Sequence, residues 1–260
     1  MDRIKFMIDS GSDIPPEVAD ALDAEVVPLY RVIDGVPVLD YHDFNIQEYS
    51  EYLKTCKEIP TTSQPSPEDF LTRYERFADE GYDHIICITM SVHGSGTYNN
   101  AVLASEMFKE HHPESAMQIH VVDSWSCSLN MVMELRLANH LLEAGAGIRT
   151  ILDELYAVRE KVRTYYLIDN LEFLIKGGRV SPLKGGIASK LRIKPIVAIK
   201  NGEGSIPANA MGYQNGLSKL AHFFWEDCTP DSELYVSHAR CPEKAMAIVE
   251  KIRERYHNLK

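Results

Sequence analysis

The chain has 260 residues, of which 45% are hydrophobic and 25% are charged, and its formal net charge is -11. This composition supports a folded core and excludes a disordered chain, and the length indicates one large domain or two ordinary ones. An acidic surface repels phosphate backbones and anionic lipid headgroups, which argues against binding of nucleic acid or of a membrane surface.

The N-terminal residues and the cysteines indicate the cellular compartment of the protein. Residues 1–5 lead into no apolar segment of the signal-peptide kind, and no run approaches the 18 apolar residues of a membrane span. The five cysteines are odd in number, scattered and without a Cys-x-x-Cys pair, which favours free thiols. We therefore expect a cytoplasmic protein.

The first half of the chain alternates between predicted strands and helices. Strands are expected at residues 3–8, 26–32, 36–39, 84–89 and 119–122, with a hairpin turn at Asp34-Gly35 and a loop at 60–67. Helices are expected at residues 15–23, 46–56, 68–79, 97–109 and 128–142. This alternation predicts an α/β domain of three layers, in which helices cover both faces of a parallel sheet.

The second half has fewer strands and predicts a smaller mixed α+β domain. Strands are expected at residues 165–168, 193–199 and 234–237, and a turn at 201–204. Helices are expected at residues 148–163, 171–175, 183–191, 213–225 and 242–257. We place the boundary within residues 145–165 and divide the chain into domains 1–155 and 156–260.

Hydroxyl-bearing and small residues follow the strands of the predicted parallel sheet. They occur at residues 9–12, 91–97 and 123–126, and a further Thr/Ser cluster lies at 61–66. Ligands of such sheets bind beyond the carboxyl ends of the strands. Gly94–Thr97 opens a helix, where free N–H groups favour an anion. Because these loops contain no Lys or Arg, they suit a single carboxylate better than a phosphate; helix capping explains the same residues and stays open.

Enzymatic and metal-dependent functions have weaker support. A serine hydrolase using Ser95 and His238 is the alternative hypothesis, but His93 and Thr97 stand where a nucleophile elbow has glycine. Asn99 replaces the third glycine of a dinucleotide fingerprint, and no Walker A sequence occurs. No histidines or cysteines have metal-ligand spacing. We therefore expect a binding protein without catalytic residues, metal or cofactor; a binder of another small carboxylate or phosphate is a third hypothesis.

Several short motifs follow one another over nearly the whole chain. They are Asp9-Ser10 with Asp13 and Pro15, Val27-Pro28-Leu29, Thr62-Ser63-Gln64-Pro65-Ser66-Pro67, Ser95-Gly96-Thr97-Tyr98, Val121-Val122-Asp123-Ser124, Lys176-Gly177-Gly178-Arg179, Lys194-Pro195 and Ser237-His238-Ala239. In this order they resemble the DegV family of bacterial fatty-acid-binding proteins, which have the EDD fold. Thr-Ser-Gln-Pro-Ser and Lys-Gly-Gly-Arg are the specific motifs among them.

The resemblance implies that a long-chain fatty acid lies in a closed tunnel between two domains. It implies that Thr62 and Ser95 bind the carboxylate. Further ligand-binding residues are then expected at Ser63, Gly96, Ser124 and His238. It also implies a separate ATP-dependent fatty acid kinase as a partner, which would fit the missing ATP site. The chain departs from the family pattern at residues 209–214, which contain no cation where relatives carry a Lys/Arg pair.

Overall fold

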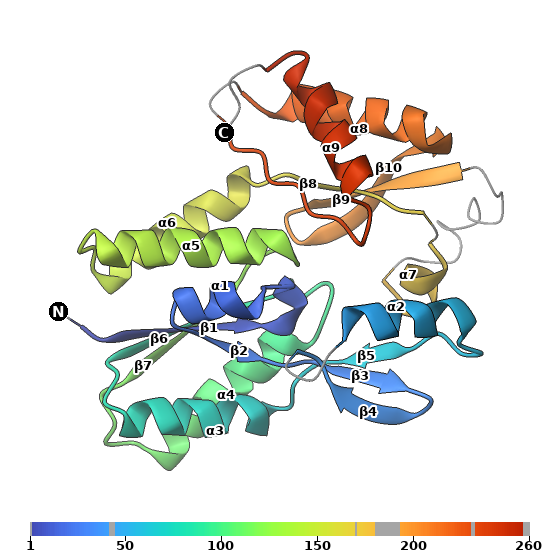
Figure 1. Cartoon of the computed structure of the whole chain (residues 1–260). Helices are drawn as coiled ribbons and strands as arrows, with labels where there is room; N and C mark the ends of the chain where they lie inside the picture. Colours follow the sequence, from blue (N-terminus) through green and yellow to red (C-terminus); the bar gives the residue numbers. More distant parts are fainter. Residues whose placement is uncertain (1, 42–44, 170, 180–192, 230–231, 257–260) are drawn as a thin grey trace. The chain divides into compact units, whose positions relative to one another are not determined.

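The computed structural model describes residues 2–41, 45–169, 171–179, 193–229 and 232–256, and Figure 1 shows the course of the chain. These residues form two compact units. The first contains Met1–Val162 and the short segment Asn201–Glu203, and the second contains Arg163–Lys200 and Gly204–Lys260. Among the described residues, no helix combines the length and the hydropathy that crossing a bilayer requires.

The first unit alternates strands with helices, as the sequence predicts. Its strands are β1 (Ile4–Asp9), β2 (Ala24–Val27), β3 (Tyr30–Ile33), β4 (Val36–Leu39), β5 (Thr61–Ser63), β6 (His84–Thr89) and β7 (Gln118–Asp123). Its helices are the short 3-10 helix η1 (Ser10–Ser12) and α1 (Pro16–Ala21), α2 (Ile46–Thr55), α3 (Pro67–Asp79), α4 (Thr97–His111), α5 (Leu129–Glu143) and α6 (Ile148–Lys161).

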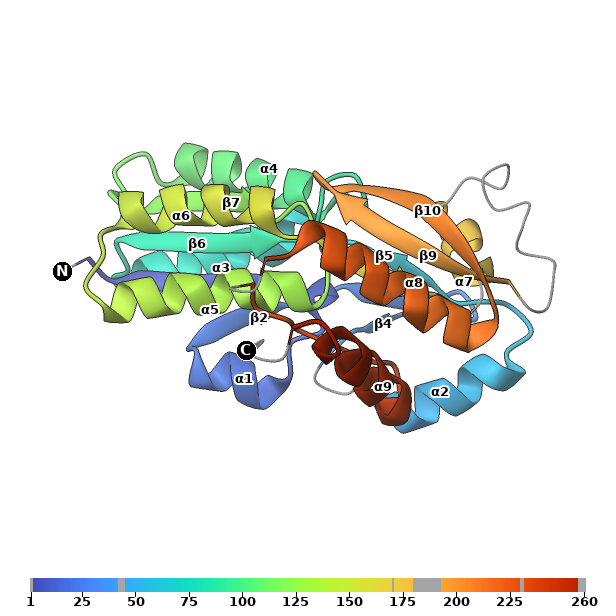
Figure 2. The same ribbon diagram turned by 90° about the horizontal axis from the view of Figure 1, so that it is seen from above.

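A parallel sheet with the strand order β2-β1-β6-β7 forms the centre of this unit. Every residue of β1 and β6 is buried, as expected for strands covered on both faces. Successive side chains of these strands point to opposite faces, so Ile86 and Cys87 enter different hydrophobic clusters. The predicted α/β fold with a parallel sheet is therefore confirmed (Figure 2).

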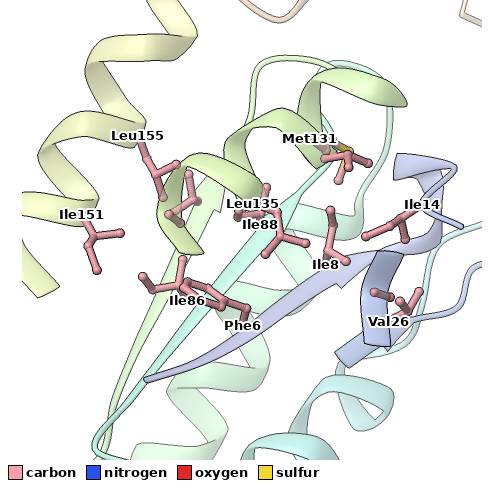
Figure 3. Close-up of a cluster of buried hydrophobic side chains, with 14 of the residues drawn as sticks. Phe6, Ile8, Ile14, Val26, Ile86, Ile88, Met131, Leu135, Ile151 and Leu155 are labelled. Carbon is pink, nitrogen blue, oxygen red and sulfur yellow. The ribbon is translucent and has the colours of Figure 1, made fainter. Parts of the chain in front are cut away.

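Helices supply the other half of each cluster. On one face, Ile86 packs with Leu135 of α5 and Leu155 of α6, as Figure 3 shows. The opposite face is covered by α3 and α4, which contribute buried aromatic residues such as Phe70 and Phe108. The apolar faces of these helices thus cover the sheet from both sides, and the polar residues Asp9, Thr89 and Asp123 lie at the carboxyl ends of β1, β6 and β7.

A second, antiparallel sheet with the order β4-β3-β5 corrects two sequence predictions. The strand expected over residues 26–32 is divided between two sheets, because Pro28 has no N–H to donate and the N–H of Leu29 donates to Ser10 Oγ at 3.0 Å. The loop expected at 60–67 contains β5, which pairs with β3. The predicted hairpin at Asp34-Gly35 is confirmed, with positive φ angles of 50° and 80°.

The second unit is a three-stranded sheet with helices. Its strands are β8 (Thr164–Leu167), β9 (Ile193–Lys200) and β10 (Glu203–Met211), and their order in the sheet is β10-β9-β8. Its helices are α7 (Glu172–Lys176), α8 (Gly212–Asp227) and α9 (Pro242–Arg253). The turn is confirmed at Asn201-Gly202, where both φ angles are positive (52° and 81°). Strand β10 was not among the predicted strands, and the helix expected at 183–191 lies outside the described residues.

The prediction of a strand at residues 234–237 is wrong, since this segment has no regular secondary structure. Leu234 and Val236 pack against a cluster formed by α8 and α9, whereas Tyr235 and Ser237 are exposed. The alternation that predicted a strand is therefore real. It reflects packing of an extended segment on helices rather than pairing with a neighbouring strand.

The two-sided core of the parallel sheet generates a stability prediction. Ile86→Ala should lower the free energy of unfolding by about 2–5 kcal/mol, because it leaves a cavity at a fully buried position on β6. Val38→Ala on β4 is the control, and it should change that free energy by no more than about 0.5 kcal/mol, since Val38 is 45% exposed. Urea unfolding followed by circular dichroism measures both, and equal losses would contradict the prediction.

Candidate functional site

Backbone hydrogen bonds join the three loops that follow β1, β6 and β7. The N–H of Ser91 donates to the carbonyl of Ser126 at 2.8 Å, and the N–H of Ser128 donates to the carbonyl of Gly11 at 2.8 Å. In parallel sheets the carboxyl ends of neighbouring strands share one edge. The structure thus brings together at this edge the hydroxyl-rich loops that the sequence singles out.

Ser95 and Gly96 lie directly before α4. The hydroxyl of Ser95 accepts a hydrogen bond from the N–H of Thr97 at 3.3 Å, and the two hydroxyl oxygens are 2.8 Å apart. Gly96 is the N-cap residue and has no side chain to cap the helix. Ser95 therefore contributes to the helix start, which agrees with the capping interpretation, while its half-buried hydroxyl group stays beside the positive end of the helix dipole.

Thr62 is the central residue of strand β5, and its side chain is exposed. Its hydroxyl makes no hydrogen bond within the part of the chain that the structure describes. The neighbouring Ser63 donates to the carbonyl of Gln64 at 3.4 Å. Gln64 in turn lies against Gly96, because a Cβ added to this glycine would come within 2.9 Å of Gln64 Nε2. The segment that carries Thr62 is thus in contact with the loop that carries Ser95.

A cation that the sequence analysis did not consider lies opposite Thr62. Arg31 of β3 is the direct partner of Thr62 in the antiparallel register, so both side chains are on the same face of the sheet. The guanidinium group of Arg31 forms an ion pair with Asp40 and lies 4.7 Å from the centre of the Tyr49 ring. The sequence offered no signal for this neighbour, because the register of β3 and β5 depends on tertiary pairing.

Ser124 is buried in the loop after β7, and its hydrogen bonds are local. Its hydroxyl accepts from the N–H of Ser126 at 3.2 Å and donates to the carbonyl of the same residue at 3.3 Å. Arg159 of α6 also contacts this loop. Its Nη1 donates to the carbonyl of Asp123 at 2.9 Å, and its guanidinium carbon lies 4.0 Å from the centre of the Trp125 ring. These contacts give Ser124 a structural role, and a ligand-binding role for it stays a prediction.

His238 belongs to the second unit and is exposed. Its Nδ1 accepts a hydrogen bond from the N–H of Cys241 at 3.3 Å, next to the start of α9. The predicted contact of His238 with a carboxylate held by Thr62 and Ser95 stays a prediction.

Among the described residues of the first unit, Asp9, Asp123 and Glu134 are buried acidic residues, and burial raises the pKa of two of them. Asp9 is fully buried, and burial raises the pKa of its carboxyl to about 7, although the N–H groups of Met90 and Gly11 donate to it at 2.7 Å and 2.8 Å and oppose the shift. Burial also raises the pKa of Glu134 well above its ordinary value, and neither oxygen of Glu134 has a hydrogen-bond partner among the described residues. The interior behind the strand-end loops therefore disfavours negative charge.

The comparisons with known proteins agree with these observations. A family model for uncharacterised proteins of the DegV family matches residues 3–260. The chain belongs to the DegV family. Among its relatives is the fatty acid-binding protein of Thermotoga maritima, which is 31% identical over 98% of this chain and 88% of the relative.

Solved structures of other members extend this comparison. A Thermotoga maritima protein, reported to reveal a fatty acid binding function, has a TM-score of 0.85 and 30% identity over 98% of this chain and 89% of that chain. A DegV protein from Ruminococcus gnavus, refined with vaccenic acid, has a TM-score of 0.87 and 27% identity over 97% of this chain and 89% of that chain. The predicted family is therefore confirmed, and the fold of these members covers nearly the whole chain.

The buried Asp9 predicts a dependence of stability on pH. Because the pKa is about 7 in the folded state and 3.8 when exposed, the unfolded state releases this proton first as the pH rises. Relative to Asp9→Asn, the wild-type protein should lose about 1.4 kcal/mol of unfolding free energy per pH unit between about pH 4 and pH 7. Above pH 7 the difference should stay constant. Urea unfolding of both proteins across this range measures it, and a difference independent of pH would contradict the prediction.

Proposed function

We propose that this protein binds a long-chain fatty acid and that Thr62 and Ser95 hold its carboxylate. The observation that carries the proposal is the contact between Gln64 and Gly96, because it joins the segment of Thr62 to the helix start of Ser95. Fatty acid binding by family members at 27–31% identity supports the choice of ligand.

The chemistry of these residues suits the head of a fatty acid. A carboxylate carries one negative charge and needs hydrogen-bond donors, which the Thr62 hydroxyl, the Ser95 hydroxyl and the N–H groups at the start of α4 can supply. Arg31 adds positive charge beside Thr62, but its ion pair with Asp40 offsets much of this charge. The balance favours a singly charged carboxylate over a phosphate.

The tail of the ligand can supply most of the affinity. Each buried CH₂ group contributes roughly 0.8 kcal/mol, so about 15 of them contribute on the order of 12 kcal/mol before the costs of association. The polar residues then need only to orient the head and to satisfy its charge. We include Ser63 and Gly96 in the proposed site because they adjoin Thr62 and Ser95, respectively.

We also infer that the protein acts as a carrier and presents the fatty acid to a separate ATP-dependent kinase. The sequence supports this inference because it contains no Walker A motif with which the chain could bind ATP itself. The family resemblance implies a Lys/Arg pair near the start of α8, and in this chain Met211, which is 68% exposed, precedes Gly212 and Tyr213 there. More residues of this chain therefore support fatty acid binding than support presentation of the fatty acid to a kinase.

Native mass spectrometry of the purified protein tests the proposed ligand. We expect added mass equal to that of a fatty acid, which is lost on denaturation. Thr62→Ala and Ser95→Ala should each weaken binding by roughly 1.5–3 kcal/mol, because each removes a hydrogen-bond donor to a charged oxygen. Titration of ligand-free protein with palmitate measures this loss.

Thr61→Ala is the matched control, because Thr61 is on the same strand and is also exposed but points to the opposite face of the sheet. Its affinity for palmitate should equal that of the wild-type protein. Protein that carries no fatty acid and does not bind added palmitate would refute the proposal. Turnover of an acyl ester that Ser95→Ala abolishes would instead favour the alternative of a serine hydrolase.

A further inference from the structure

We infer that Asn100 is a positioning residue for the carboxylate site, because it fastens the segment of Thr62 to the first turn of α4. The inference rests on the proposed function, and it adds to it a residue that is not among those proposed to contact the ligand. Asn100 Nδ2 donates a hydrogen bond to the carbonyl oxygen of Pro65 at 2.7 Å. Pro65 is three residues after Thr62 in the same segment.

Two contacts, one helical turn apart, attach this segment to α4. Gly96 and Asn100 have the spacing i and i+4, and the N–H of Asn100 donates to the carbonyl of Gly96 at 3.0 Å. Residues at this spacing share one face of a helix. Gln64 packs on Gly96, and Pro65 accepts from Asn100, so the two consecutive residues of the segment lie along this face.

The consequence is a fixed position of Thr62 relative to Ser95. Thr62 is two residues before Gln64, which corresponds to about 7 Å of extended chain, and Ser95 directly precedes Gly96. On its other side, Thr62 pairs with Arg31 through the β3–β5 register. The segment is thus held by β3 at one end and by α4 at the other. Without the bond from Asn100, this end of the segment would lose its hydrogen bond to the helix and keep the contact of the exposed Gln64 side chain with Gly96.

The bond also has a clear energetic role. Pro65 is buried and has no N–H, so its carbonyl is the single backbone group that needs a partner there. Removing the donor leaves the carbonyl oxygen of a buried residue without this hydrogen bond, which favours movement of the segment towards water. Such movement would separate the two hydroxyl groups proposed to share one carboxylate.

The experiment compares two ligands with the same tail, palmitate and hexadecanol. In Asn100→Ala, the affinity for palmitate should fall by about three- to tenfold, whereas the affinity for hexadecanol should stay the same. The neighbouring Asn99 is exposed, so Asn99→Ala is the matched control and should bind both ligands like the wild-type protein. Asn100→Asp and Asn99→Asp repeat the comparison with equal added charge, and only the former should lose preference for palmitate.

The outcomes separate the inference from the proposed function. If Asn100→Ala keeps the wild-type preference for palmitate over hexadecanol, or loses affinity for both ligands equally, Asn100 does not position the head of the ligand and the inference is wrong. If the wild-type protein and Asn99→Ala fail to bind palmitate at all, the proposed function itself is wrong. A selective loss for palmitate at position 100 alone supports both.

Discussion

Burial of the parallel sheet on both faces is the constraint on which the rest of the first unit depends. Every residue of β1 and β6 is buried, and the polar residues Asp9 and Thr89 lie at the carboxyl ends of these strands. Parallel strands end at one edge, and the loops after β1, β6 and β7 therefore meet there and hydrogen-bond to one another. The sequence supplies the hydroxyl groups, and the parallel topology gathers them at one edge of the sheet.

The Thr62–Pro67 motif divides into residues that build the fold and residues that are free to meet a ligand. Ser66 forms a capping box with Asp69, in which each side chain accepts a hydrogen bond from the backbone N–H of the other, so this serine fixes the start of α3. Pro65 is held by Asn100 of α4. Thr62, at the other end, is exposed on β5. The second half of the motif is thus bound to α3 and α4, whereas Thr62 in its first half is accessible to a ligand.

Electrostatics at this edge are more balanced than the net charge of -11 suggests. Burial keeps the pKa values of Asp9 and Glu134 raised, which reduces the negative charge behind the loops. Arg31 lies opposite Thr62, and Asp40 both pairs with it and accepts from Ser10 Oγ at 3.0 Å. A carboxylate ligand would therefore lie near hydrogen-bond donors and near Arg31, whose charge Asp40 partly neutralises, and it would not be strongly repelled by acidic groups.

The sequence by itself determined the alternation of strands and helices, the loops at the strand ends and the family, because apolar periodicity and short motifs depend on neighbouring residues. It did not determine the division of residues 26–32 between two sheets, strand β5 within an expected loop, or the irregular segment at 234–237. Only tertiary structure placed Arg31 beside Thr62 and Asn100 on Pro65. Such contacts join residues 31–35 positions apart, and local patterns carry no information about pairing over that separation.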